Sequence, residues 1–257
     1  MTPAPAAPPK AIVTGGAQGI GRAIVERLLV EGRHVVLLDA DAAAVAAVAP
    51  QLAGLGTLTA RVCDVADETA VAAAVAEVAA APGALTAVVA NAGIMIRKPV
   101  TDLSLAEWRR VIDVNLTSAF LLARACAPLM TAAGGGAMVT IASTRAHMSE
   151  PDTESYSASK GGLLALTHAL AVSLGPAVRV NCVSPGWIDV SRSRTDPAAP
   201  AEALRPVDHA QHPAGRVGRP EDVAELVSWL LSDRSGFVTG SEFIVDGGMT
   251  RRMIYAD

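Results

Sequence analysis

The chain has 257 residues, of which 51% are apolar but only 3% are aromatic, so small aliphatic side chains must fill its core. Its net charge is −4 and its basic residues are scattered, which argues against nucleic-acid or anionic-membrane partners. Cys63, Cys126 and Cys182 are odd in number and widely spaced. We interpret them as buried, reduced thiols of a cytoplasmic protein.

Residues 1–9 have neither the basic nor the apolar region of a signal peptide, and we expect a disordered lead-in there. A membrane span needs about 18 consecutive apolar residues. The longest apolar stretch, residues 119–133, is interrupted by Arg124 and Pro128. We therefore expect no membrane association.

Short apolar, β-branched runs alternate with longer helical stretches along the chain. The expected strands are residues 11–14, 34–38, 57–62, 87–90, 137–141, 178–183 and 243–245. The expected helices lie near residues 20–31, 40–51, 67–80, 104–131, 157–174 and 221–232. This alternation predicts βαβ units. The fold class is therefore α/β, with a single doubly wound (Rossmann-type) domain over residues 10–257 and a seven-stranded, mostly parallel sheet flanked by helices on both faces.

One long irregular segment, residues 187–215, is rich in Pro, Ser, Asp and His. Irregular segments of this length inside a compact domain are usually functional, so we expect a lid over the substrate. Two of its histidines, His209 and His212, follow Asp208. They are three residues apart and lack a further ligand nearby, so we expect lid hydrogen bonds or surface positions and no metal site.

A glycine-rich turn follows the first expected strand and opens the first expected helix. Glycines allow a tight turn and let backbone N–H groups approach a phosphate at a helix N-terminus. The spacing, Gly-x-x-x-Gly-x-Gly, differs from the GxGxxG of other dinucleotide folds. It predicts a nucleotide site that includes Gly15, Gln18, Gly19, Ile20 and Gly21.

The second expected strand ends at Asp39. A carboxylate there can accept both ribose hydroxyls of NAD and repels the 2′-phosphate of NADP. Gln18 and Ala40 flank this pocket, and neither could neutralise a phosphate. The alternative is a solvated acid at a strand end; we predict NAD as the cofactor.

Tyr156 and Lys160 are four residues apart on an expected helix, with Ser143 thirteen residues upstream of the tyrosine. Residues four apart share one helix face. An ammonium beside a phenol lowers the pKa of the phenol, which would allow proton transfer near neutral pH. Surface helices produce the Tyr-x-x-x-Lys spacing by chance, so its weight comes from the other features.

Together these motifs resemble the short-chain dehydrogenase/reductase family, over residues 10–250. The glycine turn is similar to the cofactor turn of the family. The resemblance also assigns Asp64 and Val65 to the adenine. The remaining similar positions are Asn91, Ala92 and Gly93 after the fourth strand, Pro185, Gly186 and Ile188 beside the nicotinamide, and the tetrad Asn115, Ser143, Tyr156 and Lys160.

The resemblance implies a role for each tetrad residue. Tyr156 exchanges a proton with the alcohol or alkoxide, and Ser143 donates a hydrogen bond to the substrate oxygen. Lys160 holds the nicotinamide ribose and shifts the tyrosine electrostatically. Asn115 helps to hold a water that continues the proton relay from the lysine.

The chain departs from the family at Val190, where a threonine usually meets the nicotinamide carboxamide. A valine side chain cannot make that hydrogen bond. The neighbouring Ser191 could replace the threonine, or the backbone could suffice.

Substrate contacts are expected from the segment between Ser143 and Tyr156 and from the lid. Arg145 could pair with a carboxylate or phosphate, and His147 and Trp187 are further candidates. Solvent or a neighbouring subunit could equally face these residues. Because the segment is polar, we expect a small secondary alcohol or ketone such as a sugar, polyol or hydroxy acid. A 3-oxoacyl or hydroxysteroid substrate, or a regulator that binds NAD without turnover, are the alternatives.

Residues 105–130 and 158–174 carry wide apolar faces with many small residues. One sheet cannot cover all of that surface. In the family these helices pair between subunits, so the resemblance implies a homo-oligomer, most often a homotetramer.

Overall fold

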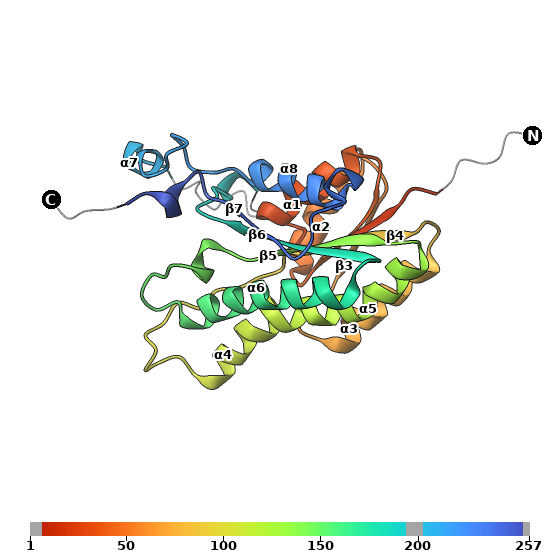
Figure 1. Cartoon of the computed structure of the whole chain (residues 1–257), viewed down its shortest axis with the longest axis horizontal. Helices are drawn as coiled ribbons and strands as arrows, with labels where there is room; N and C mark the ends of the chain where they lie inside the picture. Colours follow the sequence, from red (N-terminus) through yellow and green to blue (C-terminus); the bar gives the residue numbers. More distant parts are fainter. Residues whose placement is uncertain (1–6, 194–202, 254–257) are drawn as a thin grey trace, which may run out of the picture.

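The computed structural model describes residues 7–193 and 203–253 (Figure 1). Its seven strands are β1 (Lys10–Thr14), β2 (His34–Asp39), β3 (Leu58–Val62), β4 (Leu85–Ala90), β5 (Gly136–Ile141), β6 (Val178–Pro185) and β7 (Glu242–Val245). They form one sheet in the order β3-β2-β1-β4-β5-β6-β7, in which all neighbouring pairs are parallel. The predicted doubly wound sheet is confirmed, and in this part of the chain it is wholly parallel.

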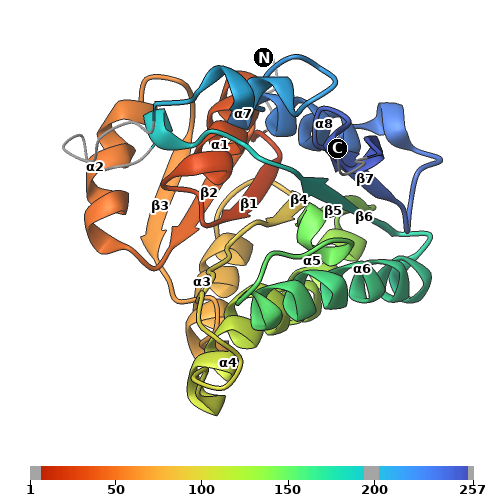
Figure 2. The ribbon, with the colours of Figure 1, turned by 90° about the vertical axis from the view of Figure 1, so that its left-hand side faces the viewer.

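The helices cover both faces of the sheet (Figures 1 and 2). One face carries α1 (Gly19–Val30), α2 (Ala42–Leu52) and α8 (Pro220–Leu231). The other carries α3 (Glu68–Ala80), α4 (Leu105–Ile112), α5 (Ser118–Ala132) and α6 (Glu154–Leu174). Because both faces are covered, the five inner strands are largely buried, as expected for a parallel sheet, whereas the edge strands β3 and β7 are only partly buried.

Alternation along each strand divides the core into two apolar layers. In β1, Ala11 and Val13 pack on the side of α1 and α8, whereas Ile12 packs on the side of α3, α5 and α6. All three side chains are fully buried. The three cysteines are also buried and unpaired, which confirms that they are free thiols.

Short polar side chains set the helix ends. Asp41 and Asp67 cap the N-termini of α2 and α3 by accepting backbone N–H bonds, and Ser104 begins α4 with a capping box to Glu107. The buried Lys10 donates to the Ala81 carbonyl at 2.6 Å and to the Val78 carbonyl, so a cation compensates the C-terminus of α3.

The long helix expected over residues 104–131 is interrupted. A π-helical turn, η1 (Asp113–Thr117), separates α4 from α5, and the Ser118 N–H bonds to the Asp113 carbonyl. Such turns insert one extra residue and occur frequently at functional sites. The span Leu105–Ala132 has the length and apolar composition of a membrane helix, but 56% of its most apolar window is buried inside the fold, as in a core helix.

The structure differs from two expectations, the extent of the disordered N-terminal lead-in and the irregular backbone of the lid. Residues 1–6 of the expected lead-in lie outside the described residues, but the Pro9 carbonyl accepts a hydrogen bond from the His34 N–H at 3.0 Å, so the ordered fold begins before residue 10. The lid is not wholly irregular, because it contains η3 (Ser191–Ser193) and the short helix α7 (Pro206–Ala210). The lid residues 194–202 lie outside the described residues.

Candidate active site

The candidate site lies where the strand order reverses, between β1 and β4. Ligands of open α/β sheets bind in the crevice beyond the carboxyl ends of the strands at such a point. A cleft of about 580 Å³ opens there, beside a smaller cavity of about 200 Å³. The residues that line both are Ile20, Asn91, Gly93, Tyr156 and Val190.

The glycine turn forms the floor of the cleft. Gly15 has a φ of +62°, which favours glycine. A Cβ atom at Gly21 would lie 2.0 Å from the Gly15 carbonyl oxygen, so a side chain is excluded there. Asn91 braces the turn by donating to the carbonyls of Thr14 at 2.9 Å and Gly15 at 3.0 Å. The turn, Gln18, Gly19, Ile20 and the residues Asn91, Ala92 and Gly93 all line the cleft.

Asp39 lies at the rim of the cleft with its carboxylate already engaged. Its Oδ2 accepts the Ala17 N–H at 3.0 Å and its Oδ1 accepts the Asp41 N–H at 3.1 Å. Gln18 Nε2 donates to Asp41 Oδ2 at 3.5 Å. Two carboxylates therefore lie at this end of the cleft.

Arg110 lines the cleft and was not predicted from the sequence. Its Nη1 lies 2.9 Å from Asp64 Oδ2, and Asp64 Oδ1 accepts the Ala66 N–H at 3.0 Å. Burial opposes ionisation, but these two partners lower the pKa of Asp64 overall. Both Asp64 and Val65 line the cleft, where the family resemblance places the adenine.

The smaller cavity brings Ser143, Tyr156 and Lys160 together. Ser143 Oγ accepts the Arg145 N–H at 3.2 Å, which leaves its own proton to donate, in the protein alone to Tyr156. Burial raises the pKa of Tyr156, and the Ser143 hydrogen bond and the Arg145 charge offset this only in part. The expectation that Lys160 lowers the phenol pKa is therefore wrong for the protein alone.

The position of the Lys160 ammonium explains why it does not lower the pKa of the Tyr156 phenol. Its Nζ donates to the Ile141 carbonyl at 2.7 Å and lies 5.5 Å from the centroid of the Tyr156 ring. Burial lowers the pKa of Lys160 to about 8. Gly93 leaves it room, since a Cβ there would lie 3.3 Å from Nζ.

Asn115, in the π-turn, braces the site with its whole side chain. Its Oδ1 accepts the Ile94 N–H at 2.8 Å, and its Nδ2 donates to the Ile94 carbonyl and to Ser159 Oγ, both at 2.9 Å. Ser159 in turn donates to the Tyr156 carbonyl at 2.7 Å. The side chain thus holds the backbone around Tyr156. Ser159 was missed by the sequence analysis because its partner lies 44 residues away.

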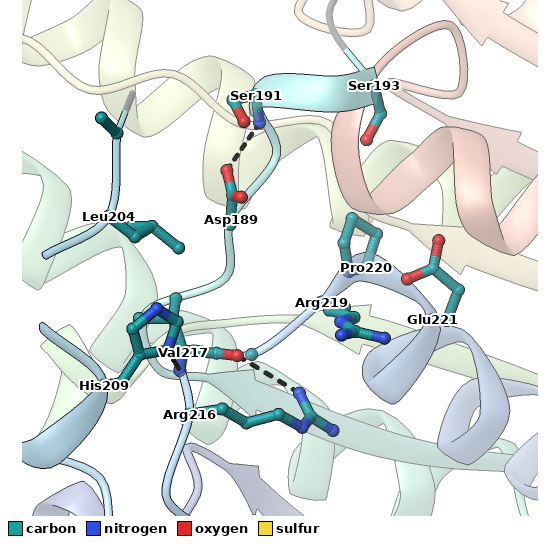
Figure 3. Close-up of a pocket in the computed structure, with 12 residues that line it drawn as sticks. Asp189, Ser191, Ser193, Leu204, His209, Arg216, Val217, Arg219, Pro220 and Glu221 are labelled. Atoms are coloured by element: carbon teal, nitrogen blue, oxygen red, sulfur yellow. Dashed lines mark hydrogen bonds between the residues drawn. The ribbon is translucent and has the colours of Figure 1, made fainter. Parts of the chain in front are cut away.

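The segment after β6 separates two cavities through alternate residues. Ile188 and Val190 line the cavity of Ser143 and Tyr156 together with Pro185 and Gly186. Asp189 and Ser191 line a different cavity, of about 660 Å³, against the start of α8 (Figure 3). Ser191 thus lies in a different cavity from Val190, so the structure does not support its hydroxyl as the replacement for the missing threonine.

Asp208 and the two lid histidines, for which we expect no metal site, hydrogen-bond to neighbouring residues. The Arg205 guanidinium lies 2.8 Å from Asp208, His212 Nδ1 lies 3.0 Å from the Asp208 carbonyl, and His209 accepts the Val217 N–H at 3.3 Å. Within the described residues no group of three or more potential ligands could hold a metal ion.

The three expected substrate residues lie in different places. Arg145 follows Ser143 directly and its side chain is about one-quarter exposed. His147 points to Glu242, with Nε2 at 2.7 Å from the carboxylate. Trp187 packs near the His212 ring, at 6.3 Å between centroids, and lines a third cavity of about 210 Å³ with residues of the lid. None of the three lines the cavity of Ser143 and Tyr156, but the Arg145 backbone N–H donates to Ser143 Oγ.

A nicotinamide dinucleotide fits this site on structural grounds. The glycine turn lines the cleft at the N-terminus of α1, where the backbone N–H groups of a helix start favour a pyrophosphate. Asp39 and Asp64 line the same elongated cleft, which continues into the cavity of Ser143 and Tyr156. Such a cofactor would supply the hydride acceptor or donor.

Comparison with known proteins agrees with this geometry. A family model described as enoyl-(acyl carrier protein) reductase matches residues 15–250. An uncharacterized oxidoreductase of Thermotoga maritima is 48% identical over 96% of this chain and 98% of its own length. The cis-4-hydroxycyclohexanecarboxylate dehydrogenase of Sinomonas cyclohexanicum is 41% identical over 93% and 96% of the two chains. A solved short-chain type dehydrogenase/reductase from Mycobacterium marinum superposes with a TM-score of 0.83 at 33% identity, covering 95% and 96%.

Proposed function

The chain belongs to the short-chain dehydrogenase/reductase family, and from that premise we propose that it is an NAD(H)-dependent enzyme that interconverts a small polar secondary alcohol and its ketone. One observation carries this proposal. Ser143, Tyr156 and Lys160 line a single cavity that continues into the dinucleotide cleft. A carbon atom in that cavity can meet a proton donor and the hydride carrier together.

The roles of the side chains follow from their contacts. Ser143 keeps its proton for the substrate oxygen, because the Arg145 N–H occupies its acceptor side. Tyr156 takes the proton of the alcohol on oxidation and returns it to the alkoxide on reduction. Lys160 lies on the same helix face, anchored at the Ile141 carbonyl, where it would hold the nicotinamide ribose.

The acidic residues at the rim of the cleft favour NAD over NADP as the cofactor. Members of the family use NAD or NADP, and a 2′-phosphate needs a cation to neutralise it. Asp39 and Asp41 lie at this end of the cleft. The cleft-lining cation among the described residues, Arg110, is paired with Asp64. Both facts favour a free 2′-hydroxyl.

A small polar substrate is favoured by the charged segment after Ser143. Arg145, which has Glu150 as its ion-pair partner, lies close to the catalytic hydroxyls. The relative from Sinomonas cyclohexanicum is named for a hydroxy acid, which supports the same class. A long apolar acyl or steroid substrate would leave this guanidinium facing hydrocarbon.

We also propose a cytoplasmic homotetramer. An apolar groove of about 630 Å³ runs between α5 and α6 and is lined by Phe120, Ala123, Leu170 and Leu174 among others. Phe120 is 44% exposed and Val172 of α6 is 83% exposed, so a second copy of this helix pair could bury them. The three free thiols suit a reducing compartment.

The proposal is tested by comparing turnover of the same substrates with NAD and with NADP. Purified protein is assayed by the absorbance of the reduced nicotinamide, with NAD and with NADP, over polyols, sugars, hydroxy acids, cyclic alcohols and acyl ketones. We expect turnover with NAD and a polar secondary alcohol. Binding of NAD without turnover of any alcohol or ketone would favour a regulator instead.

A further inference from the structure

A carboxylate beside the catalytic turn is held between two guanidinium groups. Arg145 Nη2 lies 2.5 Å from Glu150 Oε1, and Arg97 contacts Glu150 Oε2. Arg97 comes from the loop after β4 and Arg145 from the 3₁₀ turn η2 (Thr144–Ala146). Each carboxylate oxygen thus meets one guanidinium, so the two arginines form a cradle shaped for a carboxylate.

The cradle adjoins the reacting groups. The backbone N–H of Arg145 donates to Ser143 Oγ. The charge of Arg145 also acts on Tyr156, where it lowers the pKa of the phenol against the effect of burial. The backbone of Arg145 is thus fixed to Ser143, and its guanidinium is near enough for its charge to act on Tyr156.

Glu150 itself is a replaceable occupant. It lies on an exposed loop, and its side chain is 45% exposed. Burial opposes ionisation, but the two arginines lower the pKa of Glu150 overall, so it is charged at neutral pH. Exposed ion pairs of this kind contribute at most about 1 kcal/mol to stability, so exchange of one carboxylate for another costs little.

The charges around the cradle leave it cationic. Two guanidinium groups share one carboxylate, which gives the cradle a net charge of +1. The neighbouring His147 pairs with Glu242 and Lys98 pairs with Glu107. Asp152 lies on the same surface loop and Glu154 at the start of α6, and among the described residues neither forms an ion pair with Arg97 or Arg145.

We propose that Arg145, assisted by Arg97, binds the carboxylate of a hydroxy acid substrate in place of Glu150. The substrate carboxylate is unchanged in the reaction. On oxidation the phenolate of Tyr156 would take the hydroxyl proton and bound NAD would accept the hydride from the same carbon, which gives the oxo acid, neutral Tyr156 and NADH. This inference rests on the proposed function and narrows it from polar alcohols in general to hydroxy acids.

Matched substrates test the cradle directly. Each hydroxy acid that is turned over is compared with its own methyl ester, which keeps the carbon skeleton and removes the charge. We expect the wild-type enzyme to favour the acid by roughly 10-fold or more in kcat/KM, since a charged hydrogen-bonded pair is lost with the ester. An ester that performs as well as its acid would overturn the inference.

Variants of the arginines show which side chain causes the preference for the acid over its methyl ester. Arg145→Gln should lower kcat/KM for the acid by roughly 10- to 100-fold relative to the ester. The acid-to-ester ratio is the readout, because any change in the pKa of Tyr156 affects both substrates alike. Equal losses for acid and ester would assign Arg145 to the phenol alone and overturn the inference. Arg61→Gln is the matched control, since Arg61 pairs with Glu77 on the surface, away from the site.

Removal of the Glu150 carboxylate, which competes with the substrate for the two arginines, provides an independent test. Glu150→Gln should lower the KM for the acid at least about threefold, because both guanidinium groups become free, and leave the ester unchanged. An unchanged or higher KM for the acid would show that the substrate does not displace Glu150. A phosphorylated alcohol that outperforms every acid would overturn the carboxylate assignment.

The proposed function and this inference fail differently. Turnover of neutral secondary alcohols without any preference for acids would remove the inference and leave the oxidoreductase. Absence of all NAD(P)-linked turnover would remove the proposed function itself.

Discussion

At the level of single residues, the site is defined by the half-buried Tyr156 and the buried Lys160, whose ionisation is unfavourable in the protein alone. Burial raises the pKa of Tyr156 and lowers the pKa of Lys160 to about 8. Both groups are thus biased toward their neutral forms, the phenol and the amine. A phenolate and an ammonium would each stabilise the other on a shared helix face, so oxidation should accelerate as the pH rises.

The buried ammonium of Lys160 should cost stability. Its folded pKa of about 8 lies below the unfolded value, so the penalty is complete below pH 8 and disappears as the pH rises toward the unfolded pKa. The shift corresponds to about 3 kcal/mol, and loss of the hydrogen bond to Ile141 offsets about 1 kcal/mol. Lys160→Met should therefore be more stable than wild type at pH 7, by about 2 kcal/mol.

Denaturant unfolding of the cofactor-free proteins measures this difference. The advantage of Lys160→Met should shrink between pH 8 and pH 10, where the wild-type lysine becomes neutral. A variant that is less stable than wild type at both pH values would show that the ammonium is well solvated.

Asp39 combines two tasks that one substitution can separate. Its carboxylate braces Ala17 and Asp41, and its charge would repel a 2′-phosphate. Asp39→Asn keeps an acceptor oxygen but removes the charge, so kcat/KM with NADP should rise roughly 10-fold while NAD loses less than Asp39→Ala costs. Steady-state kinetics with both cofactors checks this, and an unchanged preference in both variants would refute the ribose assignment.

At the level of elements, the π-turn η1 lies between α4 and α5 in the chain. Its Asn115 side chain forms a hydrogen bond to α6, the helix that carries Tyr156 and Lys160. Asn115 reaches Ser159, and Ser159 reaches the Tyr156 carbonyl. The extra residue of the turn directs the Asn115 side chain to this contact, so Ser159 is a positioning residue.

Loss of the Ser159 hydroxyl should impair this positioning. Ser159→Ala should lower kcat roughly 10-fold with a nearly unchanged KM for NAD, since the cleft is not altered. Ser173→Ala, on an exposed position of the same helix, is the control and should be neutral. Equal losses in both variants, or a higher KM for NAD with normal kcat, would remove Ser159 from the catalytic geometry.

Local patterns predicted the fold, and three of the residues that they single out, Ser143, Tyr156 and Lys160, line one cavity. The glycine turn and the Tyr156–Lys160 spacing depend on residues close in sequence, and the seven strands follow from apolar runs. Contacts between distant segments could not be predicted: Arg110 with Asp64, or Glu150 with two arginines. The pKa of Tyr156 was also predicted in the wrong direction, because burial is a property of the whole fold.

At the level of the whole molecule, the two helical layers differ in how completely they are covered. The layer of α5 and α6 leaves the apolar groove beside Phe120 and Leu170 open. If that groove pairs two subunits, a charge placed in it must be desolvated in the assembly.

A charge in the groove should therefore break the assembly. Phe120→Glu combined with Leu170→Glu should convert a tetramer to a smaller species in sedimentation velocity. Val30→Glu is the control, because Val30 is 69% exposed at the end of α1 in the opposite layer. A wild-type monomer, or an unchanged tetramer in the double variant, would contradict the proposed interface.

The central claim is that the Tyr156 oxygen is the proton donor and acceptor in the cavity it shares with Ser143. Tyr156→Phe removes that oxygen and keeps the ring, so turnover of the best substrate should fall by about 10²-fold or more. NAD affinity, measured by fluorescence titration, should stay within a few-fold of wild type. A variant that binds NAD normally and retains turnover would contradict the account.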